Sequence, residues 1–240
     1  MAQKKVNAVI HSQEKLAEGI YSMWLDAPEM AAAAVPGQFI AVYTNDQSKL
    51  LPRPISICEA DKENGRLRIV YRIAGAGTKE FSAYKEGDTL DILGPLGNGF
   101  PLKKKKAFLI GGGIGIPPML ELAKNLDCEK TAVIGYRDQE TFLADELRKY
   151  ADVVIATEDG SVGTKGNVID AIRAEKLTAD IIYACGPTPM LKALKTYAME
   201  NGIECYISLE EKMACGIGAC LGCVCHSKDV DEHSNVRNKT

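Results

Sequence analysis

Residues 107–119, with the sequence AFLIGGGIGIPPM, indicate how the second half of the chain folds. Four apolar residues at 107–110 predict a buried strand, and the glycines after them permit a tight turn into a helix that begins at Pro117. Glycines at such a turn let a phosphate approach the backbone, and the helix N-terminus favours its negative charge. Ile116 stands where G-x-G-x-x-G has its third glycine, so the loop alone also fits an ordinary strand-to-helix turn.

Downstream of this loop, apolar and amphipathic stretches alternate. We predict strands at 131–136, 152–157, 180–185 and 204–209, and helices at 117–126, 141–150, 167–175 and 189–201. This alternation is typical of βαβ units on a parallel sheet, which bind a nucleotide at the carboxyl ends of their strands. Tyr183-Ala184-Cys185-Gly186-Pro187 ends a strand on the same side of the sheet as the glycine loop, and therefore supports a nucleotide site.

Upstream of residue 102, the sequence predicts antiparallel β structure. Apolar stretches at 4–10, 20–26, 38–43, 54–59, 66–73 and 89–93 lie between turn signals, of which Asn64-Gly65 is a strong hairpin signal. Many short strands with Gly and Pro turns indicate a sandwich or small barrel, here with one short helix at 78–84. We predict an α+β multidomain protein with an antiparallel β-barrel at 1–101, an α/β parallel-sheet domain at 102–209 and a small C-terminal segment at 210–240.

The composition excludes several classes of protein. A chain of 240 residues with 46% hydrophobic and 25% charged residues is an ordinary globular protein, long enough for two compact domains. No apolar run reaches the length of a membrane-spanning helix, and MAQKKVNAVIHSQEKL lacks the apolar stretch of a signal peptide, so we expect a cytoplasmic protein with no membrane partner. A net charge of -3 gives no footprint for nucleic acid.

Half of the eight cysteines lie close together near the C-terminus, at Cys215, Cys220, Cys223 and Cys225. In a cytosolic chain such clustering indicates metal or iron–sulfur ligation. The spacing Cys215-x4-Cys220-x2-Cys223 is the first part of the plant-type C-x4-C-x2-C…C arrangement, which holds a [2Fe–2S] cluster. A structural zinc site and free thiols stay open as alternatives, although zinc motifs usually have paired C-x2-C knuckles.

The fourth ligand of such a cluster is not evident from the sequence. No cysteine follows Cys225, which lies only two residues after Cys223 and so has tight geometry for the same cluster. His226 and His233 are alternatives, since histidines ligate Rieske centres. The polar ending Asn238-Lys239-Thr240 is also consistent with a truncated chain.

Three short segments of the predicted barrel carry polar groups suited to a ligand. Arg53-Pro54-Ile55-Ser56 places a cation and a hydroxyl at a strand start, which suits a phosphate or a flavin edge. Tyr71-Arg72 adds an aromatic ring for stacking and a second cation, and Gly77-Thr78 adds an amide and a hydroxyl. By themselves these residues fit an ordinary barrel surface equally well.

Taken together, these parts resemble the ferredoxin–NADP reductase superfamily, and within it the electron-transfer subunits of NAD-dependent (type B) dihydroorotate dehydrogenase. The segments that carry the resemblance are LPRPISI, IVYR, GAGTK, LGPLGNGF, LIGGGIGIPPM, YACGPTPML and the specific SLEEKMACGIGACLGCVC. They are spread over nearly the whole chain, so the match is much stronger than any one motif.

The resemblance implies a set of binding residues but no catalytic acid or base. The segments that match the family's FAD site are Arg53, Pro54, Ile55 and Ser56, then Val70, Tyr71 and Arg72, then Gly77 and Thr78. For NAD, the matching residues are Gly112, Gly113 and Gly115 near the pyrophosphate, and Cys185, Gly186 and Pro187 near the nicotinamide. Three cluster ligands match Cys215, Cys220 and Cys223, whereas the family's fourth cysteine is missing, which puts retention of the cluster in doubt. For Cys185, a buried strand-end thiol without a role is an equal alternative.

The resemblance also implies a function. Electrons would pass from an FMN-containing catalytic subunit that oxidises dihydroorotate, through [2Fe–2S] and FAD to NAD+, in de novo pyrimidine (UMP) biosynthesis. The expected assembly is a heterotetramer of two copies of each subunit. Arg137 and Asp138 at the end of a strand leave NAD and NADP undecided, and NAD follows from the family. The alternatives are a ferredoxin-reductase-like subunit of another NAD(P)H-linked complex, of the sulfide or hydrogenase type, and a non-enzymatic nucleotide-binding module with a structural zinc tail.

Overall fold

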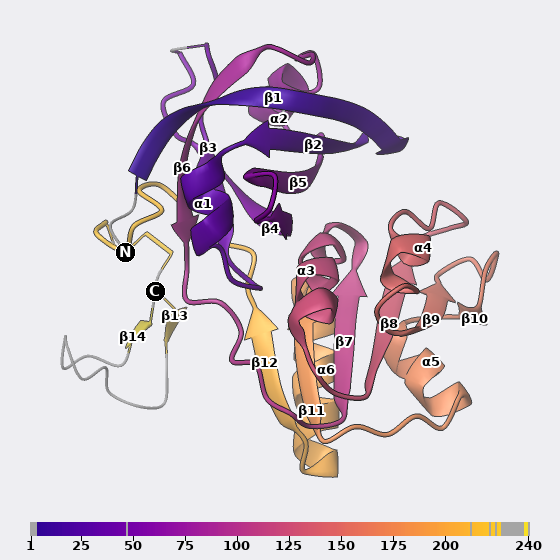
Figure 1. Ribbon diagram of the computed structural model, residues 1–240. Coiled ribbons are helices and arrows are strands. Elements are labelled where there is room, and N and C mark those ends of the chain that lie inside the picture. The colour runs from indigo at the N-terminus through magenta and orange to yellow at the C-terminus, as the bar shows by residue number, and fades with distance from the viewer. Residues whose placement is uncertain are drawn as a thin grey trace.

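The computed structural model describes residues 4–46, 48–211, 213–220, 222–223, 225–226 and 238–239. A barrel forms the N-terminal part and a parallel-sheet domain follows it, and residues 213–220 lie beside the barrel (Figure 1). The predicted α+β multidomain architecture is confirmed. Across the described ranges, no helix is long and apolar enough to cross a membrane.

The first domain is a closed antiparallel barrel with the strand order β1-β2-β5-β4-β3-β6. Its strands are β1 (Lys4–Ala17), β2 (Ile20–Asp26), β3 (Phe39–Val42), β4 (Arg53–Asp61), β5 (Arg66–Arg72) and β6 (Thr89–Leu96), and its helices are α1 (Pro28–Ala33) and α2 (Ala76–Phe81). Alternate residues such as Ile57, Leu67 and Ile69 point into the barrel and form its core. The hairpin predicted at Asn64-Gly65 joins β4 to β5, with Gly65 at a φ of 68°.

Two elements of the barrel differ most from the prediction; smaller differences are that β4 and β6 continue to Asp61 and Leu96, and that the helix predicted at 78–84 is α2 at 76–81. Strand β1 continues to Ala17, well past residue 10, because its polar second half still pairs with β2. The hydrophobic pattern missed this half because its residues are mostly polar and only half-buried. Helix α1 was not predicted, since six residues are too few for a helical period to show.

The second domain is a six-stranded parallel sheet with the order β10-β9-β8-β7-β11-β12. Its strands are β7 (Ala107–Gly112), β8 (Lys130–Tyr136), β9 (Asp152–Thr157), β10 (Thr164–Lys165), β11 (Ile181–Cys185) and β12 (Glu204–Ser208). Its helices are the 3-10 turn η1 (Gly113–Gly115), α3 (Pro117–Asn125), α4 (Ala144–Leu147), α5 (Val168–Ala174) and α6 (Thr188–Asn201). Helix α4 is shorter than predicted because Leu143 has a left-handed φ of 65°, which ends any helix that would continue upstream. Two short strands, β13 (Cys225–His226) and β14 (Asn238–Lys239), pair near the C-terminus.

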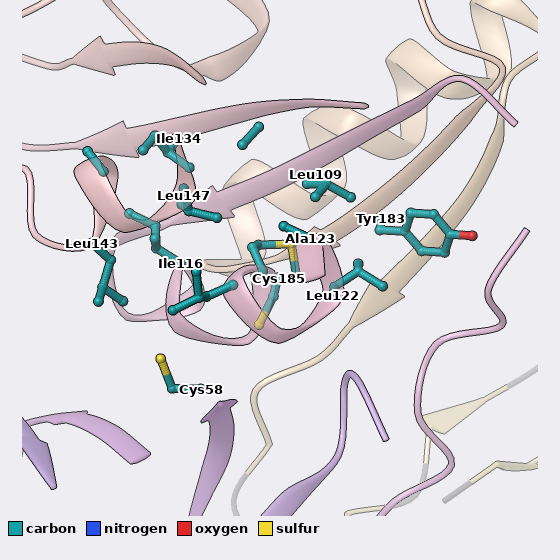
Figure 2. Close-up of a cluster of buried hydrophobic side chains, with 14 of the residues drawn as sticks. Cys58, Leu109, Ile116, Leu122, Ala123, Ile134, Leu143, Leu147, Tyr183 and Cys185 are labelled. Atoms are coloured by element: carbon teal, nitrogen blue, oxygen red, sulfur yellow. The ribbon is translucent and has the colours of Figure 1, made fainter. Parts of the chain in front are cut away.

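An apolar cluster continues from the barrel into the second domain. Cys58 of β4 and Val70 of β5 pack with Ile116 and Met119 of the second domain. Figure 2 shows Cys58 below the second domain, with its side chain directed toward Ile116 and Leu143. The two domains therefore share a buried boundary rather than meeting only through the connecting chain.

Candidate functional site

The first and third barrel segments predicted to bind a cofactor meet in the structure. Arg53 begins β4 and lies over Gly77 in the first turn of α2, so closely that a methyl group on Gly77 would overlap the guanidinium. The Thr78 hydroxyl accepts hydrogen bonds from the backbone N–H of Ala74 at 2.9 Å and of Gly75 at 3.2 Å, which fixes the turn before α2. A cation thus lies directly over a glycine-containing turn at the start of a helix, an arrangement that fits a phosphate.

The second predicted cofactor segment, residues 70–72, does not present its aromatic ring to the barrel surface as its sequence suggests. Val70 faces the domain boundary, whereas Arg72 is exposed. The Tyr71 ring is only 2% exposed inside the barrel, where it stacks on Tyr21 at 5.9 Å and its hydroxyl donates to Gln13 at 2.9 Å. A ring packed in this way cannot stack on a ligand at the barrel surface, so the stacking role predicted for it is wrong.

We expect Gly77→Ala to weaken flavin binding by displacing Arg53. The new methyl group would overlap Nε and Cζ of the guanidinium, which must then leave its place. The FAD Kd should rise at least about tenfold if Arg53 supplies one charged hydrogen bond to the cofactor, so less flavin should be retained after gel filtration. Gly75→Ala is the matched control, because a methyl group there meets nothing within 4 Å. Equal flavin retention by the two variants would contradict this placement of Arg53.

Glu80 of α2, the helix that carries Gly77, binds the connection between β3 and β4 through several hydrogen bonds. Its carboxylate accepts hydrogen bonds from Lys49 at 2.5 Å, from the Tyr84 hydroxyl at 2.6 Å, and from the backbone N–H of Asn45 at 2.7 Å and Asp46 at 3.2 Å. Burial opposes the charge, but these donors outweigh it and lower the pKa of Glu80 to about 2. The chain that leads into Arg53 is therefore held by an ionised carboxylate.

This lowered pKa predicts an acid-dependent loss of stability. A group with a lowered pKa in the folded state stabilises the fold above its unfolded pKa, and that contribution is lost as the pH falls toward about 2. The stability difference between the wild type and Glu80→Gln should therefore be largest above about pH 5 and shrink toward pH 2. Urea unfolding across this range measures it, with the exposed Glu63→Gln as control. A pH-independent difference would contradict the assignment.

The two glycine-containing segments of the second domain lie against each other at the carboxyl edge of the sheet. Strands β7 and β11 are parallel neighbours, with Gly111 opposite Cys185. A methyl group on Gly115 would overlap the Cys185 carbonyl and lie 2.6 Å from the Gly186 nitrogen, and one on Gly186 would lie 3.1 Å from the Gly112 nitrogen. Only glycine permits this close packing of the two backbone segments, which are called the glycine cradle below and lie at the sheet edge where a dinucleotide is expected.

Cys185 is part of the wall of this cradle and not a reactive group. It is 3% exposed, and burial raises its pKa to about 12 against a weaker opposing hydrogen bond from Ser208. The thiol is therefore protonated at neutral pH. Met190, on the first turn of α6, also belongs to the wall, because its sulfur would lie 2.7 Å from a methyl group on Gly112. Sequence reasoning missed Met190, which only its position shortly after Pro187 could have marked.

The residues expected to distinguish NAD from NADP lie at the end of β8. Arg137 and Asp138 are both exposed, and the Asp138 carboxylate accepts the backbone N–H of Glu140 at 2.9 Å. Asp138 is thus engaged within its own turn, and the pair still does not decide between the two nucleotides.

Cys215, Cys220 and Cys223 belong to a short loop, called the cysteine segment below, whose backbone suits the binding of a thiolate. The Cys215 sulfur accepts the backbone N–H of Cys220 at 3.4 Å, and amides of Cys220 and Ile217 lower the pKa of Cys215 to about 6. Gly216 and Gly218 have φ values of 71° and 78°, which allow the chain to turn around the sulfur. Amides directed at a thiolate fit an iron–sulfur ligand.

The structure does not gather all of the predicted ligands. Among the residues it describes, no group of three or more His, Cys, Asp or Glu side chains could hold a metal ion. Cys220 is exposed, and Cys215 and Cys223 are half-buried. Of the alternatives for a fourth ligand, the side chains of Cys225 and His226 and the whole of His233 lie outside the described parts of the chain.

The cysteine segment rests on the barrel next to the first cofactor segment. A methyl group on Gly216 would lie 3.2 Å from the Leu96 side chain of β6 and 3.8 Å from the Ala41 side chain of β3. Ala41 is the register partner of Pro54 on β4. Adjacent strands are about 4.8 Å apart. The contact of Gly216 with Ala41 on β3 is therefore one strand spacing away from residues 53–56 on β4.

Comparison with known proteins identifies the domains and the family. Residues 8–100 match the model of the oxidoreductase FAD-binding domain, and residues 210–238 match that of the iron-sulfur cluster binding domain of dihydroorotate dehydrogenase B. The structure of an NADH-dependent reduced ferredoxin-NADP oxidoreductase, described for flavin-based electron bifurcation, is similar with a TM-score of 0.84 and 32% identity over 90% of this chain and 81% of that chain. The ferredoxin NADP+ reductase from Neisseria gonorrhoeae, at 18% identity and a TM-score of 0.70 over 86% of this chain and 99% of that chain, shows the fold alone. The fold and the matched domains define a flavin- and iron–sulfur-containing reductase.

Curated relatives specify the family within this class. The electron transfer subunit of dihydroorotate dehydrogenase B (NAD(+)) from Streptococcus mutans is 45% identical over 97% of this chain and 93% of its own length. The subunit of the same name from Bacillus velezensis is 41% identical over 95% of this chain and 92% of its own length. The chain belongs to the family of dihydroorotate dehydrogenase B electron transfer subunits, which confirms the resemblance inferred from its motifs.

Proposed function

We propose that this chain is the electron transfer subunit of an NAD-dependent dihydroorotate dehydrogenase and serves de novo pyrimidine biosynthesis. It is an oxidoreductase subunit that takes electrons from an FMN-containing catalytic subunit and reduces NAD+, and does not itself oxidise dihydroorotate. The observation that carries the proposal is the contact of Gly216 with Leu96 and Ala41, which brings the cysteine segment beside the flavin-binding strands.

Each unit of the chain has one task in this proposal. The barrel, residues 1–101, binds FAD, with Arg53 and the turn at Gly77 on its phosphates. Residues 102–209 bind NAD in the glycine cradle, and residues 210–240 hold [2Fe–2S] with Cys215, Cys220 and Cys223 as ligands. A flavin accepts single electrons and donates a pair, so FAD joins a one-electron cluster to a two-electron nicotinamide. The protein groups then need only bind, orient and exclude water, which agrees with the protonated, buried Cys185.

The proposed partner is the catalytic subunit, in an assembly of two copies of each. The names of the relatives support a partner, since an electron transfer subunit implies another that oxidises the substrate. Electron transfer requires close approach, so we place the partner over the exposed Cys220 segment.

The test is an absorption spectrum of the protein purified without oxygen, with iron and zinc measured on the same sample. Flavin with about two iron atoms per chain is the expected result, and another residue or chain then completes the cluster. Zinc without flavin would overturn the proposal.

A second candidate function has one observation in its favour. The NADH-dependent reduced ferredoxin-NADP oxidoreductase is 32% identical over 90% of this chain, so the chain could serve a complex of that kind. The two functions differ in the electron donor. NAD+ reduction by the purified complex with dihydroorotate supports the first function, and NADP+ reduction that requires both NADH and reduced ferredoxin supports the second.

A further inference from the structure

A buried arginine of the barrel is bound to the second domain. Arg68 of β5 has a side chain only 5% exposed, and it donates to the Glu146 carboxylate of α4 from Nη1 at 2.5 Å and from Nη2 at 3.1 Å. Its remaining donor, Nε, bonds the Ser22 hydroxyl at 2.9 Å. The guanidinium also lies over the Trp24 ring, 5.8 Å from its centroid. Every side of this cation is occupied, and its strongest contact crosses the domain boundary.

Two further polar contacts cross the same boundary close by. The Glu59 carboxylate of β4 accepts a hydrogen bond from Lys124 Nζ of α3 at 2.6 Å, and its other oxygen lies 3.5 Å from Nη1 of Arg68. Glu121 of α3 is 2% exposed, and its carboxylate accepts the backbone N–H of Ala60 at 3.0 Å. Glu59 and Ala60 directly follow Cys58 on β4, so these contacts lie next to the apolar boundary formed by Cys58 and Val70 with Ile116.

Such an interface fixes one orientation of the two domains. Domains joined by a short linker move relative to each other unless their interface is large and hydrophobic. Here an apolar centre excludes water, and sliding it would leave buried charges without partners, which is costly. The bidentate pair of Arg68 and Glu146 further restricts the angle between the two domains, because a planar guanidinium matches a carboxylate in only a narrow range of angles.

The orientation matters because elements at this boundary carry the two cofactor sites. Strand β4 begins at Arg53, and α3 begins two residues after Gly115. Arg68 lies 3.5 Å from Glu59 of β4, and α4, which carries Glu146, packs on α3. We infer that Arg68 is a positioning residue for hydride transfer, holding the nicotinamide cradle in register with the flavin strands through Glu146. This inference rests on the proposed function of the chain as a flavin- and NAD-binding reductase.

The test separates positioning from stability by comparing two arginines of one strand. Arg66, two residues before Arg68 on β5, pairs with Asp26 of β2 at 3.1 Å on the surface of the barrel domain, so Arg66→Met removes an ion pair without touching the domain boundary. The FAD-loaded full-length variants are mixed with NADH without oxygen, and the loss of flavin absorbance is followed at increasing NADH. The rate constant at saturation and the NADH Kd are obtained from the same series.

We expect Arg68→Met to lower the saturating rate constant at least about tenfold, because small misplacements of reacting groups have effects of this size or larger. The NADH Kd should change less than about twofold, since the cradle itself is intact, and Arg66→Met should stay within about twofold of the wild type in both quantities. Glu146→Gln should slow the reaction in the same direction and add little in the double variant, because the two residues act as one pair. Arg68→Lys should recover only part of the rate, since an ammonium cannot reproduce the fork.

A saturating rate for Arg68→Met equal to that of Arg66→Met, even with a lower Tm, would overturn the inference and leave Arg68 a purely stabilising residue. If Arg68→Met does not fold, Glu146→Gln decides in the same way, since its side chain is 35% exposed and its carboxamide keeps the shape. A wild-type chain that binds FAD but is not reduced by NADH would instead refute the proposed function.

Discussion

Replacing Cys220 by serine removes iron from the protein and stops electron transfer from dihydroorotate, while oxidation of NADH through the flavin continues. Cys220 is exposed whereas Cys215 and Cys223 are half-buried, and its N–H donates to the Cys215 sulfur. Loss of an outer-shell partner alone costs roughly 10- to 100-fold in metal affinity, and loss of a ligand should cost more. Iron should fall from about two per chain to near zero, measured together with NADH oxidation by an artificial acceptor.

The matched control for this variant is Cys205→Ser. Cys205 is a half-buried thiol on β12, outside the cysteine segment, so its replacement should leave both the iron content and both activities in place. Loss of NADH oxidation along with the iron in a folded Cys220→Ser protein would contradict the division of labour between the segment and the flavin domain. Unchanged iron would show that Cys220 is not a ligand.

Much of the fold could be predicted because local patterns agree with it. Strands β2 and β9 have the predicted bounds, and α3 begins at Pro117 as expected, since proline needs no hydrogen-bond partner there. The Gly115 cradle was also within reach, because parallel strands end at one edge of a sheet.

The direction of individual side chains and the contacts between the two domains depend on tertiary packing, which a local sequence pattern does not show. Strand β5 is buried on both sides, with Tyr71 facing the barrel interior and Val70 the second domain. Alternation therefore could not show that the Tyr71 ring points inward. The pairing of Arg68 with Glu146 joins residues 78 positions apart, and only the docking of the domains creates it.

We expect Gly115→Ala to weaken NADH binding strongly, because it disturbs the glycine cradle. The new methyl group would overlap the Cys185 carbonyl and lie 2.6 Å from the Gly186 nitrogen, closer than the 3.0 Å that real Cβ atoms essentially never cross. Because both neighbours are backbone atoms at the end of β11, no side-chain rotation relieves the overlap, and the η1 turn must move away from the end of β11. Overpacking of this kind costs about 1–3 kcal/mol of stability. The NADH Kd should rise at least about tenfold, measured by titration of the FAD-loaded protein.

Gly135→Ala is the control that isolates the cradle from a general intolerance of the sheet. Gly135 lies on β8 opposite Gly112 of β7, but a methyl group there meets chiefly the Val168 side chain at 3.1 Å, which can shift by a few tenths of an ångström. Its NADH affinity should therefore stay within about twofold of the wild type, because the segments at Gly115 and Gly186 keep their contact. A Gly115→Ala protein that binds NADH as tightly as Gly135→Ala would show that the nucleotide does not use this cradle.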